Sequence, residues 1–300
     1  MIERCLGALV AQAPEVNVVV VDNASSDATV ERARRHRAHV IANSQNRGFA
    51  GAVNQVCADI PADHLVLLLN PDTELLTPLG PLTEKCATAG LGAGKLVDEN
   101  GNTQAGFTVR RFPTPWSLVF ELLGINRLWP QNYINRRYRY ADRDLEKPGP
   151  VEQPAGAFLM FRRNVWEKLG GFDERFFPVW FEDVDFCQRA VLAGFSIEYV
   201  PFVYARHAGG HSVSVLPTEA RATYWCVSLL RYAAKYYGPL SFRGLCLAVM
   251  LSSVPRMLLA AFQNPRGDRD RNLRPSSAFL KIMAFAGQCL WSPARAWRAI

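Results

Sequence analysis

Asp72 is a residue whose type and position in the sequence suit chemistry. It follows an apolar run, Leu65–Leu69, which is too short for a helix and ends at Asn70-Pro71. The run predicts a strand buried on both faces, as in parallel sheets covered by helices. Pro71 keeps the preceding residue extended, so Asp72 stays at the strand tip. Ligands of open α/β sheets bind at this carboxyl edge. Alone, an Asp in a turn more often only bonds within the turn, so its role depends on the rest of the chain.

Three more carboxylates, Glu182, Asp183 and Asp185, lie close together among Phe and Trp residues. Carboxylates in apolar surroundings are costly unless they are paired or used. The structural explanation is a helix that starts near Glu182 and gains from acids in its first turn. The functional explanation is a general base at the mouth of that helix, either Asp183 or Glu182. Partial burial raises the pKa of a carboxylic acid toward values that suit a base.

Asp22 and His207 extend this set of groups. Asp22 ends a Val-rich run, Val16–Val21, where it suits hydrogen bonds to a nucleotide. Asp72 offers the oxygen ligand that Mg²⁺ or Mn²⁺ prefers, and His207 suits the same metal shell, although a lone loop histidine is more often a surface or core residue. A cation for a leaving diphosphate, a base for a hydroxyl and a nucleotide pocket are what sugar transfer from a nucleotide diphosphate requires.

The elements that position these residues alternate along the chain. Strands are predicted at 16–21, 39–42, 65–69, 91–96, 153–161 and 196–200, and helices at 3–12, 28–36, 50–58, 77–89, 164–169 and from 182 onward. Ser25 or Ser26 is the expected cap of the second helix. The order strand, helix, strand, helix, strand indicates a βαβαβ unit with a parallel sheet. The chain starts with a helix, so a strand expected before it is missing from this sequence.

Two regions depart from this alternation. Residues 107–150 are rich in Arg, Pro and aromatic residues and are predicted to be an irregular functional loop. The end of the chain holds two apolar segments, Leu240–Phe262 and Ala278–Trp297. Arg243, Arg256 and Pro255 interrupt the first, which favours amphipathic helices in a membrane interface, with a single membrane span as the alternative.

Charge and cysteine content indicate the compartment and the partner. Residues 221–300 hold 12 Lys and Arg against 2 Asp and Glu, whereas residues 1–220 hold 22 against 25. A basic tail interleaved with apolar runs predicts an anionic membrane surface as partner and no nucleic acid. The 7 Cys have no metal-type spacing and are predicted to be reduced thiols of a cytosolic protein. We therefore expect a catalytic domain at 1–220 and a basic amphipathic helical tail at 221–300.

Several short motifs occur in an order that is specific as a set. They are Val-Val-Asp22-Asn23-Ala-Ser25-Ser26-Asp27, Asn46-Arg47-Gly48-Phe49-Ala50-Gly51-Ala52-Val53-Asn54, Asn70-Pro71-Asp72-Thr73-Glu74, Gly156-Ala157, Gly170-Gly171-Phe172-Asp173-Glu174 and Phe181-Glu182-Asp183-Val184-Asp185-Phe186. With these motifs, residues 1–215 resemble the inverting family 2 glycosyltransferases of the GT-A fold. The resemblance implies a Rossmann-like, mixed and mostly parallel sheet flanked by helices, here with a C-terminal helical extension that associates with membranes.

The resemblance also implies roles for single residues. Asn70-Pro71-Asp72 stands where the family has its Asp-x-Asp metal motif, so Asp72 would bind Mg²⁺ or Mn²⁺, and His207 matches a metal-binding histidine of some members. Asp183 would be the base, with Glu182 beside it. The residues implied in donor binding are Asp22, Asn23, Asn46, Gly48, Asn54 and Asn70. Two departures are an Asn in place of the first acid of Asp-x-Asp and the missing first strand of the family.

Within the family the motifs are most similar to bacterial rhamnosyltransferases. That similarity implies a dTDP- or UDP-sugar donor, a lipid-linked or polysaccharide acceptor of the cell surface, and a peripheral location on the inner face of the cell membrane. A nucleotidyltransferase would instead open with a Gly-rich phosphate loop and a Lys, and this sequence has neither. The remaining alternative is a membrane-attached nucleotide-sugar-binding protein that is catalytically impaired because it lacks the first strand.

Overall fold

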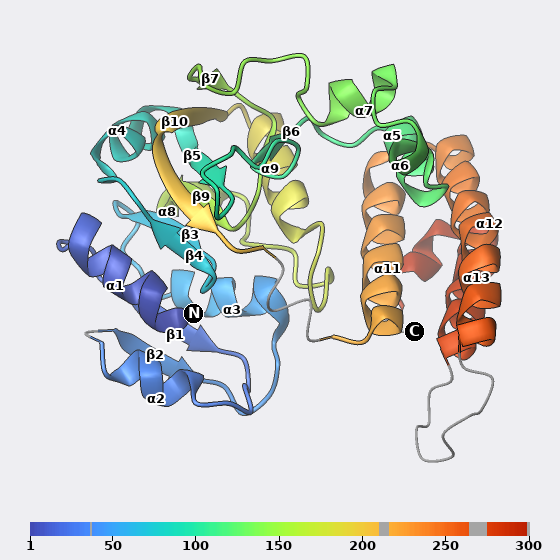
Figure 1. Cartoon of the computed structure of the whole chain (residues 1–300), viewed down its shortest axis with the longest axis horizontal. Coiled ribbons are helices and arrows are strands. Elements are labelled where there is room, and N and C mark those ends of the chain that lie inside the picture. The colour runs from blue at the N-terminus through green and yellow to red at the C-terminus, as the bar shows by residue number, and fades with distance from the viewer. Residues whose placement is uncertain (37, 210–215, 264–274, 299–300) are drawn as a thin grey trace. The chain divides into compact units, whose positions relative to one another are not determined.

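The structure is a computed structural model that describes residues 1–36, 38–209, 216–263 and 275–298 (Figure 1). The chain divides into two compact units. Unit 1 comprises Met1–Phe112, Arg137–Pro178 and Glu182–His211, and unit 2 comprises Pro113–Arg136, Val179–Phe181 and Ser212–Ile300. The division predicted from the sequence, into a catalytic domain at 1–220 and a basic helical tail at 221–300, remains a prediction.

Unit 1 is a mixed α/β unit, as the sequence predicts. Its helices and strands are α1 (Ile2–Gln12), β1 (Val19–Asp22), α2 (Thr29–Arg34), β2 (His39–Ala42), α3 (Gly48–Cys57), β3 (Leu65–Leu69), β4 (Thr73–Leu75), α4 (Gly80–Ala89), β5 (Gly90–Val97), β6 (Val109–Arg110), β7 (Gly149–Pro150), β8 (Gln153–Pro154), β9 (Phe158–Arg162), α8 (Arg163–Lys168), α9 (Glu182–Leu192) and β10 (Ser196–His207).

Among the described residues, β1 and β2 form a parallel pair, and a six-stranded sheet has the path β3-β9-β5-β10-β4, with β7 beside β10. In this sheet β5 and β10 run parallel, whereas β3 runs antiparallel to β9, with Leu69 opposite Phe158. The expectation that Leu65–Leu69 pairs in a parallel βαβαβ sheet and is buried on both faces is wrong. As an edge strand β3 has one neighbour, and of its residues Val66 alone is buried.

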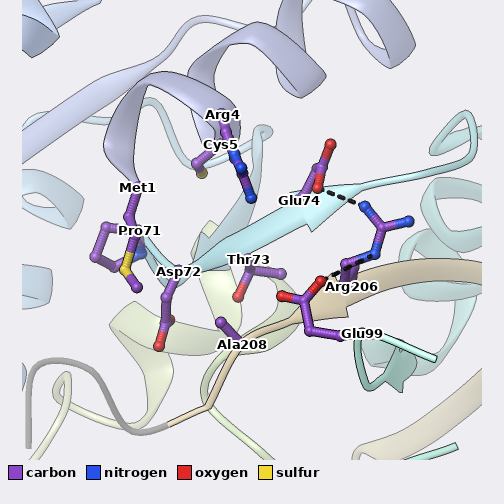
Figure 2. Close-up of a pocket in the computed structure, with 10 residues that line it drawn as sticks. All are labelled: Met1, Arg4, Cys5, Pro71, Asp72, Thr73, Glu74, Glu99, Arg206 and Ala208. Atoms are coloured by element: carbon purple, nitrogen blue, oxygen red, sulfur yellow. Dashed lines mark hydrogen bonds and ion pairs between the residues drawn. The ribbon is translucent and has the colours of Figure 1, made fainter. Parts of the chain in front are cut away.

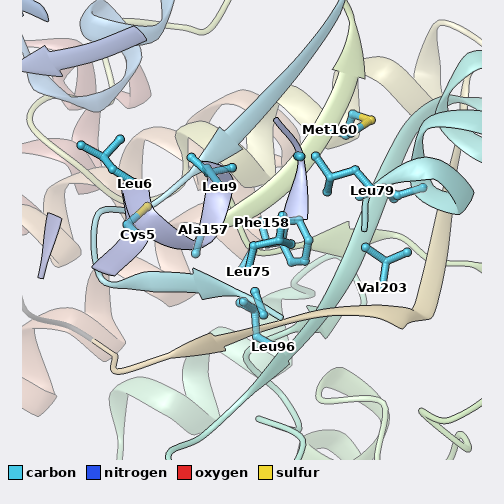
Figure 3. Packing of buried hydrophobic residues seen from close by; sticks show 14 of the residues in the cluster. Cys5, Leu6, Leu9, Leu75, Leu79, Leu96, Ala157, Phe158, Met160 and Val203 are labelled. Carbon is cyan, nitrogen blue, oxygen red and sulfur yellow. The ribbon is translucent and has the colours of Figure 1, made fainter. Parts of the chain in front are cut away.

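The core beside the site packs α1 onto the six-stranded sheet. Cys5, Leu6 and Leu9 recur on one face of α1, as the helical period requires, and all are less than 10% exposed. They belong to one buried cluster with Leu75 of β4 and Phe158 of β9 (Figure 3). Burial of large apolar side chains on this scale contributes about 1.5–3 kcal/mol each, so the cluster fixes the strand ends that carry the polar residues.

Two further expectations about local structure are wrong. Neither Ser25 nor Ser26 caps α2. The helix follows Ala28, and Asp27 Oδ1 instead accepts a hydrogen bond from the Thr29 backbone N–H at 3.0 Å. Ala24 has φ of 63°, which turns the chain before both serines and leaves them upstream of the helix start.

Residues 107–150 are not irregular throughout, because they contain α5 (Pro115–Leu122), α6 (Ile125–Leu128) and α7 (Tyr133–Tyr138). Thr114 and Ser117 form a capping box at the start of α5, with Pro115 in its first turn. The sequence Thr-Pro-Trp-Ser carries this signal, although the surrounding Arg and Pro residues hide it.

Unit 2 is helical. Besides α5 and α6 it contains α11 (Thr218–Tyr236), α12 (Pro239–Gln263), α13 (Pro275–Trp291) and a 3₁₀ turn at Pro293–Trp297. The helix α12 packs against α13, α11 and α5. Its stretch Pro239–Leu259 is the one described segment that is long and apolar enough to cross a membrane by length and composition. All 7 cysteines of the chain are buried, and all are unpaired, as predicted for reduced thiols.

Candidate active site

Asp72 and His207 face each other at the end of two paired strands. In the antiparallel pair β4–β10, Thr73 lies opposite His207, and the Asp72 backbone oxygen accepts a hydrogen bond from the Ala208 N–H at 3.1 Å. His207 Nε2 lies 3.6 Å from Asp72 Oδ1, and the two side chains are only 3% and 4% exposed. The structure thus joins a residue of the Asn-Pro-Asp motif to a histidine far along the chain.

His207 is held by two neighbours besides Asp72. The Gln104 side-chain amide lies against its Nδ1 and its backbone oxygen, and the Phe107 ring stacks on the imidazole at 4.9 Å with 6° between the planes. Burial lowers the pKa of His207 from its ordinary value, against the opposing effect of the Asp72 carboxylate. Burial thus favours the neutral imidazole, which is the form that binds metals.

The pair Asp72 and His207 suits a divalent cation. Their imidazole nitrogen and carboxylate oxygen lie 3.6 Å apart and would offer such a cation two ligand atoms. A carboxylate oxygen with an imidazole nitrogen favours Mn²⁺ over Mg²⁺, because Mg²⁺ selects oxygen ligands. The described residues contain no cluster of three or more His, Cys, Asp or Glu able to hold a metal. Substrate phosphates and water would have to complete the shell, as they do in many phosphate-handling sites.

Asp183 and Glu182 open α9 but have different surroundings. Asp183 is half-buried, and its two carboxylate oxygens accept hydrogen bonds from the backbone N–H groups of Gly156, at 3.0 Å, and Val184, at 2.8 Å. Glu182 is only 4% exposed, and its Oε2 has no hydrogen-bond partner among the described residues. Burial, and secondarily the Asp183 charge, raise the pKa of Glu182 well above its ordinary value. Asp183 is therefore the accessible carboxylate of the two.

The position of α9 is fixed by its apolar face and by one ion pair. Phe186 is fully buried and stacks on Phe172 with ring centroids 4.1 Å apart. Asp185, the third acid of the motif, is fully buried and pairs with Arg189, with 2.8 Å between Oδ2 and Nε. Asp185 thus stabilises the helix, whereas Asp183 at its mouth points to Gly156.

Hydrogen bonds connect Asp183 to the strand tip that carries Asp72. Gly156 donates to Asp183, and the next residue, Ala157, accepts from the Asn70 backbone N–H at 3.1 Å. Both residues lead directly into β9, which pairs with β3. The predicted base and the predicted metal ligand are therefore brought to the same edge of the six-stranded sheet from positions far apart in the sequence.

Asp22 and Asn23 organise a second polar edge at the end of β1. Asp22 is 5% exposed and its Oδ2 accepts from the Ser25 N–H at 3.0 Å. Asn23 donates to the Gly48 backbone oxygen at 3.0 Å, and Asn46 accepts from the Gly48 N–H at 2.8 Å. Gly48 has φ of 72°, and a Cβ at this position would lie 3.0 Å from the Pro178 oxygen, so only glycine fits. Four of the predicted donor-binding residues thus form one connected loop structure, while their contact with a donor remains a prediction.

The side chain of Asn54 is held by four hydrogen bonds to the segment that precedes α9. Its side chain donates to the Phe172 oxygen and to Glu174, and accepts from the Trp166 indole N–H and the Phe172 N–H, all at 2.8–2.9 Å. These bonds use every hydrogen-bonding direction that an amide commonly fills. Asn54 therefore shapes the site by fixing α3 to the segment before α9.

A small cavity of about 100 Å³ lies beside Asp72, lined in part by Arg4, Cys5 and Arg206 (Figure 2). Arg206 pairs with Glu74 at 2.8 Å. The cavity is smaller than the roughly 300 Å³ of typical ligand pockets, so it holds only part of a nucleotide-sized ligand.

Residues that contact His207, Gln104 and Phe107, were not predicted from the sequence. They follow the turn at 98–102, and nothing in their spacing indicates a contact with residue 207. The second histidine of that region, His211, lies outside the described residues.

Comparison with known proteins decides the family. The family model described as glycosyl transferase family 2 matches residues 1–170. The chain belongs to this family. A second model, described as the N-terminal domain of galactosyltransferase, matches residues 136–210 of this chain. The predicted family is thereby confirmed.

Named relatives of the glycosyltransferase include N-acetylglucosaminyl-diphospho-decaprenol L-rhamnosyltransferase of Mycobacterium tuberculosis. It is 28% identical over 262 residues, which cover 79% of this chain and 81% of the relative. Rhamnosyltransferase WbbL of Escherichia coli (strain K12) is 29% identical over 155 residues, covering 50% of this chain and 54% of the relative. A Haloferax volcanii protein named low-salt glycan biosynthesis hexosyltransferase Agl10 is 26% identical over 193 residues, covering 63% of this chain and 58% of the relative.

Among solved structures, that of GalNAc-T7 with UDP, GalNAc and Mn²⁺ superposes with a TM-score of 0.52 at 12% identity. The match covers 95% of this chain and 54% of that chain, and it confirms the predicted GT-A fold.

Proposed function

We propose that the protein transfers a hexose, rhamnose or a similar sugar, with inversion from a dTDP- or UDP-sugar to a hydroxyl of a lipid-linked or polysaccharide acceptor. One observation carries the proposal: the hydrogen bonds of Gly156 and Ala157 connect Asp183 and the strand tip before Asp72 to the same end of the six-stranded sheet. The names of the Mycobacterium tuberculosis and Escherichia coli relatives support rhamnose, and the first of them supports a polyprenyl-linked acceptor.

In the proposed reaction Asp183 is the general base. It takes the proton of the acceptor hydroxyl while that oxygen bonds to C1 of the sugar and the bond from C1 to the phosphate oxygen breaks. The N–H groups of Gly156 and Val184 hold the carboxylate in place. Because the neighbouring Glu182 is buried, this end of α9 offers one accessible carboxylate, which supports a single displacement and inversion at C1.

Asp72 and His207 would hold Mg²⁺ or Mn²⁺, which neutralises the charge that develops on the leaving diphosphate when it is bound. Asp22 would bind the nucleotide, and the loop built by Asn23, Asn46 and Gly48 would border it. The buried position of the Asp72 and His207 side chains excludes water from their shared face, and this strengthens charge interactions there.

The proposal assigns residues 221–300 to attachment at the inner face of the cell membrane. Exposed leucines recur along α12 at Leu247, Leu251 and Leu258, which are 48%, 64% and 50% exposed, whereas Val249 on the other side is fully buried. This stripe, together with the basic charge of the segment, supports a helix lying in the interface of an anionic bilayer. Cosedimentation with vesicles should occur with anionic lipids and disappear with zwitterionic ones; no binding to either would reject this part of the proposal.

The central test is turnover of a panel of nucleotide sugars with Mg²⁺ or Mn²⁺ by the protein, by Asp183→Asn and by Asp72→Ala. We expect one donor to be consumed and both variants to lose that activity. Activity that survives Asp183→Asn would reject Asp183 as the base, and activity that is independent of added metal would reject the role of Asp72.

A second candidate is a nucleotide-sugar-binding protein with impaired transfer. It is favoured by the sheet topology, because no strand among the described residues joins the β1–β2 pair to the six-stranded sheet. Tight binding of one nucleotide sugar without turnover in the same panel would favour this candidate over the transferase.

A further inference from the structure

The Gln104 side chain makes two hydrogen bonds to one residue, His207. Its Nε2 lies 2.7 Å from the His207 backbone oxygen, and its Oε1 lies 3.0 Å from His207 Nδ1. A backbone oxygen only accepts hydrogen bonds, so the amide nitrogen must face it and the amide oxygen must face the imidazole. The orientation of the amide is thus determined by its partners.

This orientation determines which imidazole nitrogen carries the proton. The amide oxygen of Gln104 only accepts, so His207 Nδ1 must donate and therefore bears the hydrogen. In the neutral ring, Nε2 then has its lone pair, and Nε2 is the atom that lies 3.6 Å from Asp72 Oδ1. A lone pair and a carboxylate oxygen repel each other in a buried site unless a proton or a metal cation lies between them.

The backbone of Gln104 is itself held. Its N–H donates to the Leu96 oxygen at 2.9 Å, and its own oxygen accepts from the N–H groups of Phe107 and Thr108 at 3.0 and 2.9 Å. The Phe107 ring stacks on the imidazole from the same short segment. The short segment that follows β5 therefore determines both the tautomer and the plane of the histidine ring.

We propose that Gln104 is a positioning residue that keeps His207 in the Nδ1–H tautomer, so that Nε2 joins Asp72 in binding a divalent cation. The inference rests on the proposed metal role of these two residues. Hydrogen bonds from a metal-bound histidine to such neighbours orient the ring, and their loss costs about 10- to 100-fold in metal affinity.

The test compares Gln104→Leu with Gln104→Glu. Leucine removes both hydrogen bonds. Glutamate keeps an acceptor for Nδ1–H but replaces the donor to the His207 backbone oxygen. A purely structural role predicts that both variants behave alike, whereas a tautomer role predicts that only leucine releases the ring. Gln55→Leu is the matched control, because Gln55 makes a reciprocal amide pair with Asn43, at 3.0 and 3.1 Å, and does not contact His207.

The first readout is the ¹⁵N NMR spectrum of histidine-labelled, metal-free protein at alkaline pH, with the His207 signals assigned by their loss in His207→Asn. We expect Nδ1–H in the unmodified protein, in Gln104→Glu and in Gln55→Leu, and a mixture of tautomers in Gln104→Leu. The Nε2–H tautomer in the unmodified protein, or an unchanged tautomer in Gln104→Leu, would overturn the proposal.

The second readout is binding of Mn²⁺ alone, followed by the electron paramagnetic resonance signal of free Mn²⁺. Affinity should fall about 10- to 100-fold in Gln104→Leu and remain within a few fold in Gln104→Glu and Gln55→Leu. Equal losses in both Gln104 variants, or no binding by a protein that has the Nδ1–H tautomer, would overturn the ligand role. Neither readout needs a sugar donor, so absence of transferase activity would reject the proposed function without deciding this inference. If Gln104→Leu does not fold, the tautomer of the unmodified protein and of Gln104→Glu decides.

Discussion

Glu182 and Asp183 are adjacent acids, and replacing each by its own amide should affect kcat very differently. Asp183→Asn removes the base and should lower kcat by about 100- to 10,000-fold. Glu182→Gln keeps the size of a side chain that is 4% exposed and replaces an acid whose burial already favours its neutral form, so kcat should change by no more than a few fold. An active Asp183→Asn with an inactive Glu182→Gln would refute the assignment of the two acids.

The stability of the same variants tests the physical reason. Because the pKa of Glu182 is raised in the folded protein, the folded state holds its proton to higher pH than the unfolded state does. The stability that this proton supports is fully present below the unfolded pKa and is lost as pH rises through the folded pKa. Between these two values the free energy of unfolding should fall by about 1.4 kcal/mol for each pH unit, a slope that Glu182→Gln lacks.

Urea unfolding of the protein and of Glu182→Gln at a series of pH values measures this difference. The midpoint of the variant should rise relative to that of the unmodified protein from about the ordinary pKa of a glutamate upward. Curves that stay parallel at every pH would show that Glu182 ionises alike in the folded and unfolded states, and the argument from burial would fail.

Three other substitutions test the architecture. Asn54→Asp keeps the shape of the side chain but turns two donated hydrogen bonds, at 2.8 and 2.9 Å, into contacts between oxygens, and should lower the free energy of unfolding by about 2–5 kcal/mol, measured in urea; an unchanged midpoint would contradict it. Arg189→Met removes the cation paired with the fully buried Asp185 and should lower the free energy of unfolding by about 3–5 kcal/mol in the same assay. A loss well below this range would show that the ion pair does not stabilise the fold. Glutamate at both Leu251 and Leu258, on the exposed stripe of α12, should abolish cosedimentation with anionic vesicles while thermal unfolding stays unchanged; retained binding would assign attachment to another surface.

The sequence alone was sufficient to predict the helices and strands that have a local signal. The helix at Ile2–Gln12, the strands at His39–Ala42 and Leu65–Leu69 and the helix that begins at Glu182 all lie where their periodicity or flanking residues predict them. Asp72 at a strand tip follows from the same kind of signal, because Pro71 restricts the backbone on both sides of itself. The family also follows from the sequence, because several short motifs in fixed order are specific even where each is weak.

Only the tertiary structure decided which of these residues meet. Whether Leu65–Leu69 pairs with a parallel or an antiparallel neighbour depends on hydrogen bonds to β9, a partner that no local pattern names. The contact of Gln104 with His207 joins residues 103 positions apart, and nothing in the spacing of either residue indicates it. Local propensity acts over a few residues, whereas the protonation of an imidazole and the availability of a carboxylate depend on what is packed around them. The sequence therefore determined the chemistry that is present, and packing decided which atoms of it face each other.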